Sequence, residues 1–149
     1  MKLDNQNICL TVPADANYID IIRLALYGIS TKWGFSYEEI EDMKVAVAEA
    51  CNNAVLHAYR DGEVGTIEVT FNHEDNGIRI SVKDKGKSFN YNRRSGQTMA
   101  HHCKELSEID AGGLGIYLMQ ALMDDVQVVT DSGTEVILTK FLQTGEGMQ

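Results

Sequence analysis

Hydrophobic periodicity changes several times along this chain, and the order of the changes restricts the folds that it can adopt. Apolar residues recur at helical spacing in three segments: 16–33, about 37–59, and a shorter one that follows residue 115. Strand-like alternation of apolar and polar residues marks five segments: 8–12, 66–72, 78–83, 126–130 and 135–142. The predicted order of elements is therefore β-α-α-β-β-loop-α-β-β.

Tight turns join most of the predicted strands. Asp75-Asn76-Gly77 separates the second strand from the third, and Asp131-Ser132-Gly133 separates the last two. Strands joined in this way pair antiparallel, and helices that are apolar on one side cover one face of such a sheet. The sequence predicts a single α+β domain over residues 1–149, a two-layer sandwich with a mostly antiparallel sheet and its helices on one face.

Local signals mark the ends of the first two predicted helices. Asp15 is a suitable N-cap for the first helix, and Gly34 is a suitable residue to end it. Ser36 and Glu39 have the spacing of a capping box, which predicts the start of the second helix.

The composition disfavours several classes of protein. The net charge of -9 opposes binding to a nucleic-acid backbone, and no apolar run approaches the length of a membrane span. The polar N-terminus lacks the apolar core of a signal peptide. Cys9, Cys51 and Cys103 are scattered without a CxxC pair, which argues against a disulfide framework and against a zinc knuckle. We therefore expect a cytoplasmic protein with no direct contact to nucleic acid or membrane.

Residues 86–111 form the longest stretch without sustained periodicity. Five basic residues and no acidic residue lie between Lys85 and Lys104, in a chain that is acidic elsewhere. Such a segment is either a binding site for an anionic ligand or an ordinary solvated basic loop. The run His101-His102-Cys103 has no second His or Cys pair at ligand spacing, so we do not expect zinc.

A polar stripe runs along the second predicted helix. Glu49, Asn53 and His57 recur at every fourth position, so they share one face of the helix. Asn is a poor residue for a helix interior, and Asn52 and Asn53 stand among Ala, Cys and Val. Polar groups in so apolar a setting need partners. The stripe either faces a ligand or metal ion, or it forms a hydrogen-bonded network or an exposed face.

Two further motifs lie at the ends of predicted elements. Asp84 ends the third strand, where its carboxylate can accept a hydrogen bond from a ligand amine, and Gly86 permits a close backbone approach. An ordinary turn has the same composition. Gly112-Gly113-Leu114-Gly115 opens the third helix, where free N–H groups and the helix dipole favour a phosphate. The GK[ST] of a Walker A loop is absent.

The three motifs occur in one order: Glu-x-x-x-Asn on a helix, Asp-x-Gly after a strand, and a glycine-rich turn before a later helix, with a long loop in between. This combination resembles the GHKL (Bergerat-fold) ATPases. Within that group, segments 40–59 and 112–126 resemble the N box and the second Gly box of the anti-sigma-factor serine kinases, and segments 22–24 and 138–140 also match. The resemblance covers nearly the whole chain, and it implies the Bergerat fold and an ATP-dependent protein serine kinase.

The resemblance also implies a role for each motif. Glu49 is expected to be the general base that accepts the proton of a substrate serine, and Asn53 to hold Mg²⁺ through its side-chain oxygen. Asp84 is expected to bind the adenine amine of ATP, with Gly86 beside it. The other expected contacts are Gly113 and Gly115 with the phosphates, Thr139 near the base, and residues 86–111 as an ATP lid.

Two protein partners follow from the same resemblance: a sigma factor, and a STAS-domain anti-anti-sigma protein that is phosphorylated on serine. Arg23 matches a position of partner contact in the family, although an exposed helix arginine is the alternative. A homodimer is expected, with the first strand and helix as its interface. Two other functions stay open: an ATP-gated binding module without phosphoryl transfer, and a detached histidine-kinase ATPase domain. The histidine-kinase domain is disfavoured, because we expect no dimerising phospho-acceptor helix pair ahead of this domain.

Overall fold

The computed structural model describes residues 6–61, 65–84, 114–130 and 133–143. The predicted ATP lid, Gly86, Gly113 and Cys103 lie outside these residues, as does the side chain of His57. The described elements are β1 (Asn7–Pro13), the 3-10 turn η1 (Ala16–Tyr18), α1 (Ile19–Lys32), α2 (Tyr37–Asp61), β2 (Thr66–Glu74), β3 (Gly77–Asp84), a helix at 114–122, β4 (Asp125–Val129) and β5 (Glu135–Phe141).

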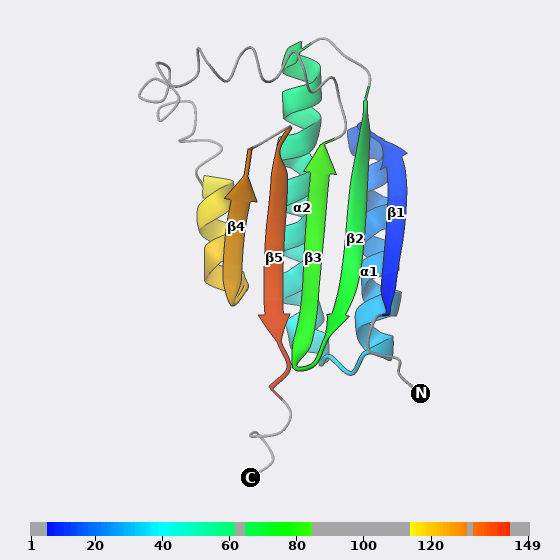
Figure 1. The fold of residues 1–149 in the computed structure, drawn as a ribbon, viewed down its shortest axis with the longest axis vertical. Coiled ribbons are helices and arrows are strands. Elements are labelled where there is room, and N and C mark those ends of the chain that lie inside the picture. The colour runs from blue at the N-terminus through cyan, green and yellow to red at the C-terminus, as the bar shows by residue number, and fades with distance from the viewer. Residues whose placement is uncertain (1–5, 62–64, 85–113, 131–132, 144–149) are drawn as a thin grey trace.

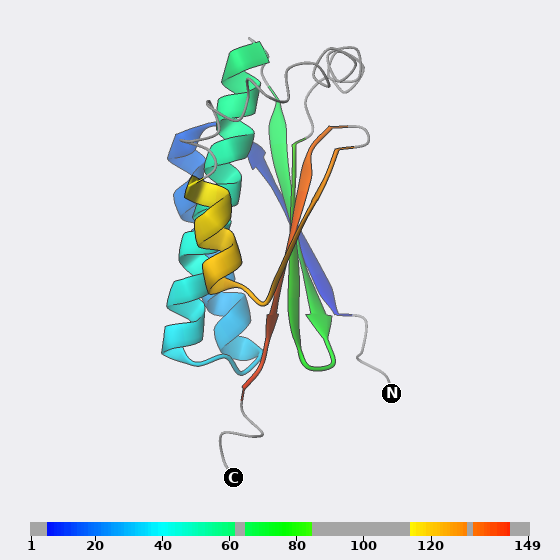
Figure 2. The same ribbon diagram turned by 90° about the vertical axis from the view of Figure 1, so that its left-hand side faces the viewer.

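The five strands form one antiparallel sheet in the order β1-β2-β3-β5-β4. Figure 2 shows α1, α2 and the helix at 114–122 together on one face of this sheet, with the other face uncovered by any described helix. The predicted two-layer α+β sandwich is confirmed. It forms because every helix has one apolar side, and a single sheet face buries all three sides at once.

Strand register decides which side chains face the helices. Val69, Val82 and Val136 stand side by side across the three central strands, and all three are buried. The neighbouring row of Phe71, Ile80 and Leu138 is fully buried as well. Side chains alternate between the two faces along a strand, so the residues between these rows point to the uncovered face.

The same alternation places the side chains of Asp84 and Lys140 on the helix-covered face, at opposite ends of the sheet. Asp84 is paired with Ile67 at the end of β3, and Lys140 is paired with Ile78 near the end of β5. These residues lie at the two ends of the interface between the sheet and the helices. Everything between them on that face is apolar core.

The capping signals read from the sequence are confirmed. Asp15 accepts a hydrogen bond from the backbone N–H of Asn17 at 2.9 Å, although the turn that it caps is η1, and α1 begins three residues later. Gly34 follows α1 with φ +95°, and Phe35 N–H donates to the carbonyl of Ser30 at 3.0 Å, as in a Schellman motif. Both backbone features end α1 without leaving its last carbonyls unpaired.

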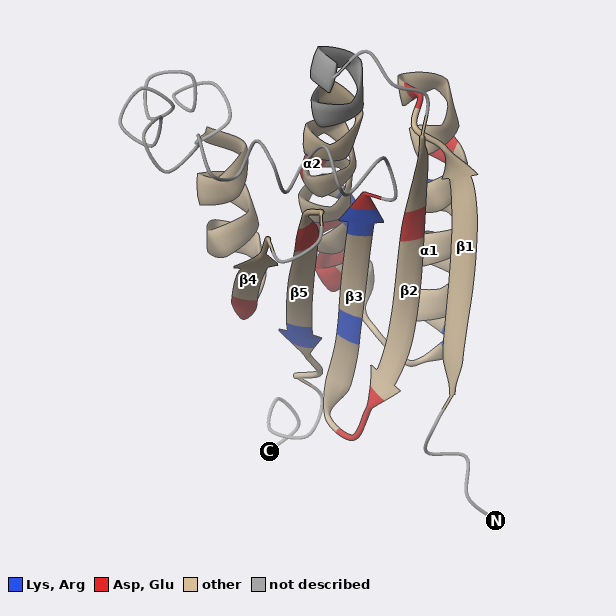
Figure 3. Cartoon of the chain, turned by 45° about the horizontal axis from the view of Figure 1, so that its top comes forward, with Lys and Arg blue, Asp and Glu red and all other residues tan. Residues whose placement is uncertain are grey.

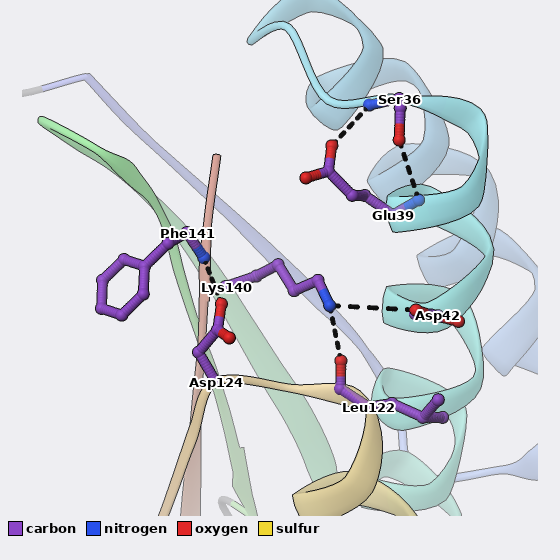
Figure 4. Close-up of polar contacts among 7 residues, drawn as sticks. All are labelled: Ser36, Glu39, Asp42, Leu122, Asp124, Lys140 and Phe141. Carbon is purple, nitrogen blue, oxygen red and sulfur yellow. Dashed lines mark hydrogen bonds and ion pairs between the residues drawn. The ribbon is translucent and has the colours of Figure 1, made fainter. Parts of the chain in front are cut away.

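The start of α2 is closed by reciprocal hydrogen bonds. Glu39 N–H donates to Ser36 Oγ at 3.1 Å, and Ser36 N–H donates to Glu39 Oε1 at 2.8 Å (Figure 4). α2 is the central helix of the layer, since it contacts α1, β2, β3 and β5. Its N-terminal cap therefore helps to fix the helix that carries the polar stripe.

Among the described residues, no helix is both long enough and apolar enough to cross a membrane.

Ser36→Ala removes one half of the capping box and leaves an N–H group of the first turn of α2 without its acceptor. We expect a loss of about 1 kcal/mol in the free energy of unfolding. Ser36→Asp keeps an acceptor at the N-cap and should restore most of the loss. Denaturant unfolding of the three proteins measures the effect, and equal stabilities would show that the capping box contributes nothing.

Candidate active site

The polar stripe of α2 lies at the border between the core and the surface. Ala50, Cys51 and Ala54 are buried against the rest of the protein, whereas the side chains of Glu49 and Asn53 are half-buried. Asn52 is exposed. One turn of helix therefore presents a carboxylate and an amide at the edge of the helix layer, anchored by the apolar residues between them.

Gly115 brings the glycine-rich turn to this stripe. It is buried in the first turn of the helix at 114–122, and a β-carbon on it would lie 2.8 Å from Glu49 Oε1. The carboxylate of Glu49 thus rests against the N-terminal turn of that helix. Free backbone N–H groups and the positive end of the helix dipole are found at such a turn, and both favour a phosphate. Two motifs far apart in the sequence become one site.

Asp84 lies at the end of β3, half-buried on the helix-covered face. Its backbone N–H donates to the carbonyl of Thr134 at 3.0 Å. Gly133 has φ +106°, and a β-carbon on it would lie 3.1 Å from the carbonyl oxygen of Asp84. The turn before β5 is therefore packed against Asp84.

Thr134 is a residue that the sequence analysis missed. The turn signal at Gly133 was visible, but only the pairing of β3 with β5 shows that the turn returns to Asp84. Thr139, by contrast, is paired with Arg79 and Asp125 and lies between Leu138 and Lys140, whose side chains face the helices. Strand alternation directs Thr139 to the opposite face. The structure brings Thr134, and not Thr139, to the side of Asp84.

Arg23 and Glu49 line one open hollow between α1 and α2. The hollow has a volume of about 510 Å³, and its other lining residues are Glu41, Lys44, Val45, Ala48 and Asn52. Arg23 forms an ion pair with Asp20 at 2.5 Å, and Lys44 forms one with Glu41 at 3.1 Å. Figure 3 shows acidic residues on α2 and residues of both signs on β3 and β5. The hollow therefore presents side chains of both signs of charge, and the carboxylate of Glu49 is one of them.

The described residues contain no cluster of three or more His, Cys, Asp or Glu side chains that could hold a metal ion. Asn53 offers a single amide oxygen instead. Mg²⁺ in nucleotide sites takes few protein ligands and completes its shell with phosphate oxygens and waters, so this donor chemistry fits Mg²⁺ bound with a nucleotide.

Comparisons with known proteins identify the family of this fold. A model of the histidine kinase-like ATPase domain matches residues 12–140. The fold and the site thus define an ATP-binding domain of that class, in which a helix carries the polar stripe and a later helix carries the glycine turn.

Relatives narrow the class further. The chain is 48% identical over 139 residues to the serine-protein kinase RsbW of Bacillus pumilus, covering 89% of this chain and 84% of the relative. It is 42% identical over 146 residues to the RsbW of Bacillus subtilis, covering 95% and 89%. The chain belongs to the histidine kinase-like ATPase family and, within it, to the serine-protein kinases of the RsbW group.

A solved structure shares the fold. The crystal structure of the RsbU and RsbW domains of a Mycobacterium tuberculosis protein matches with a TM-score of 0.63 at 21% identity. The match covers 92% of this chain and 32% of the other, so this chain corresponds to about a third of that longer protein.

Gly115→Ala tests the contact between the glycine turn and Glu49. The new methyl group meets the flexible end of the Glu49 side chain, so it displaces the carboxylate rather than the backbone. We expect phosphorylation activity to fall about tenfold or more, because reacting groups tolerate little misplacement, while the free energy of unfolding stays level or rises.

Gly28→Ala is the matched control for this variant. Gly28 lies in α1 and has open space around its missing β-carbon. Alanine there should raise stability by about 0.5–1 kcal/mol and leave activity unchanged. Equal activities of Gly115→Ala and the parent protein would show that the position of the Glu49 carboxylate is unimportant.

Cys51 should be chemically inert. Burial raises the pKa of its thiol to about 12, against a smaller lowering by the positive charge of Arg23, so the thiol stays protonated at pH 8. Cys9 is exposed. In a Cys103→Ser variant, a thiol reagent at pH 8 should modify one cysteine rapidly and the second only after unfolding. Two rapidly modified thiols in the folded protein would contradict this assignment.

Proposed function

We propose that this chain is an anti-sigma factor and a serine-protein kinase, which binds a sigma factor and phosphorylates a STAS-domain anti-anti-sigma protein on serine. The observation that carries the proposal is the position of Glu49. Its carboxylate rests against the glycine turn at Gly115 on one side and lines the open hollow on the other. A base in that position stands between a bound phosphate and an incoming protein.

The reaction assigned to the site is a direct phosphoryl transfer. Glu49 accepts the proton of the substrate serine hydroxyl. The serine oxygen forms a bond to the γ-phosphorus of ATP while the bond from that phosphorus to the β–γ bridging oxygen breaks, and ADP leaves. Positioning and charge neutralisation supply most of the catalysis in reactions of this kind.

The nucleotide is assigned to the space between β3 and the two helices that bear the motifs. In this proposal, the carboxylate of Asp84 accepts a hydrogen bond from the adenine amine, with Gly86 and Thr134 beside it. Backbone N–H groups at Gly113 and Gly115 bind the phosphates. Residues 86–111 serve as the ATP lid, and their basic side chains offset the charge of the triphosphate.

Asn53 is assigned to Mg²⁺ through its side-chain oxygen. The ion would neutralise charge on the phosphates and hold them in line with the serine. Asn53 lies one turn beyond Glu49 on the same face of α2, so one helix orients both the base and the metal ligand.

The partners are assigned to the outer side of the helix layer. Arg23 and the hollow beside it form a surface of mixed charge that also includes the apolar side chains of Val45 and Ala48. A partner that docks there places its serine next to Glu49. In this proposal, the first strand and helix form the interface of a homodimer. The protein acts in the cytoplasm, where a sigma factor and ATP are both present.

Glu49→Gln tests the assigned base, because glutamine keeps the size of the side chain and cannot accept the proton. We expect phosphate transfer to a candidate STAS-domain partner to fall at least about a hundredfold, with ATP affinity nearly unchanged. Asn53→Ala should lose transfer as well and should weaken Mg-ATP binding. Transfer is followed by the mass of the partner protein.

Glu38→Gln is the control, since Glu38 is an exposed carboxylate in the first turn of the same helix. It should phosphorylate at the parent rate. Parent-level transfer by Glu49→Gln would remove Glu49 from the mechanism, and ATP binding without any transfer by the parent protein would leave an ATP-gated binding module. An acid-labile phosphohistidine product would indicate the histidine-kinase type instead.

A further inference from the structure

Lys140 is a charged residue inside the interface between the sheet and the helices. Only 10% of its side chain is exposed. Its Nζ donates a hydrogen bond to the carbonyl oxygen of Leu122 at 2.7 Å and lies 3.8 Å from Asp42 Oδ2 (Figure 4). Leu122 is the last residue of the helix at 114–122, and Asp42 belongs to α2. One ammonium group therefore joins β5 to both helices that form the active site.

The chain beyond Leu122 is held at the same place. Asp124 N–H donates to the carbonyl of Thr139 at 2.8 Å, and Phe141 N–H donates to Asp124 Oδ2 at 2.7 Å. Figure 4 shows the contact between Phe141 and Asp124 close to the contacts of Lys140, at the end of the helix. The C-terminal end of the helix at 114–122 is thus tied to β5 on both sides of Lys140.

The helix at 114–122 and α2 run antiparallel, and the distance between their two contacts is the same along both helices. Figures 1 and 2 show the helix at 114–122 beside α2 with the opposite direction. Gly115 contacts Glu49 at one end, and Leu122 meets Asp42 through Lys140 at the other. Gly115 and Leu122 are seven positions apart on one helix, and Asp42 and Glu49 are seven positions apart on α2, so each separation is a rise of about 10 Å. The Lys140 contact and the Gly115 contact therefore set one common alignment of the two helices.

We propose that Lys140 is a positioning residue, which fixes the helix at 114–122 along α2 and thereby holds the glycine turn in place for the phosphates of ATP. The inference rests on the proposed function, because it assumes that ATP phosphates bind at that turn. Nothing in the sequence motifs assigns a role to Lys140 beyond its match to the family pattern.

The chemistry of the contact favours this role over simple packing. Removing an ammonium group from water is costly, and an apolar side chain in the same position would contribute more to stability. The ammonium group does something that an apolar group cannot do: it satisfies a carbonyl at the end of a helix, where the dipole is negative. A directional hydrogen bond and a charge pair specify one position of the helix, whereas apolar contacts allow it to slide.

Lys140→Met removes the ammonium group and keeps most of the buried volume, so it separates positioning from packing. We expect the dissociation constant for ATP, measured by direct titration, to rise about tenfold, because the N–H groups of the glycine turn are no longer held in place for the phosphates. Lys140→Arg can still donate to the Leu122 carbonyl and should recover most of the affinity. An irreversibly misfolded fraction would lower the number of binding sites per chain and leave the dissociation constant unchanged, and reversible unfolding is measured separately by denaturant titration.

Lys32→Met is the matched control. Lys32 also lies in the last turn of a helix, α1, but it is exposed. It should bind ATP as the parent protein does. A second readout requires no nucleotide: amide hydrogen exchange within 114–122 should accelerate in Lys140→Met relative to exchange in α1, and it should do so in neither Lys140→Arg nor Lys32→Met.

The outcomes separate this inference from the proposed function. If the parent protein binds ATP and the dissociation constant of Lys140→Met differs from that of the parent by less than about twofold, the positioning role is overturned and the kinase assignment stands. A Lys140→Arg variant no better than Lys140→Met overturns the role as well. If the parent protein does not bind ATP, the proposed function fails, and unchanged exchange within 114–122 in Lys140→Met would then overturn the positioning role separately.

Discussion

The contact between Gly115 and the carboxylate of Glu49 is the constraint around which the rest of the site is arranged. A β-carbon at Gly115 would lie 2.8 Å from Glu49 Oε1, so the carboxylate can rest against this turn of the helix only because the residue is glycine. The sheet supports this contact through the buried apolar side chains that lie between Asp84 and Lys140 on its helix-covered face. The capping box at Ser36 and the polar cluster around Lys140 hold the two helices at their other ends.

This arrangement places the carboxylate of Glu49 between two different surroundings. On the inner side, Glu49 faces the turn whose N–H groups suit a phosphate, and on the outer side it lines the hollow that Arg23 shares. A kinase for a protein substrate needs both, because the nucleotide and the serine must approach the base from different directions.

Sequence patterns predicted most of the fold correctly, and they failed where register mattered. The helix caps at Asp15 and Ser36 were read from short spacings and are present. Thr139 was expected near the adenine, yet the alternation of β5 directs it to the uncovered face of the sheet. Thr134 was missed because its neighbour Asp84 lies on a different strand. Both threonines belong to the β5 side of the sheet, and only the pairing of β3 with β5 shows which of them stands beside Asp84.

The sequence by itself determined the features that depend on neighbours within a few positions: helices and strands, their caps and turns, and the Glu49–Asn53 stripe. Tertiary structure alone decided which distant groups meet. Gly115 reaches Glu49, Thr134 reaches Asp84, and Lys140 reaches the carbonyl of Leu122. The physical reason is that local patterns record the periodicity of one element, whereas a buried polar contact depends on how two elements are aligned. Only packing of the helices against a register-fixed sheet determines that alignment.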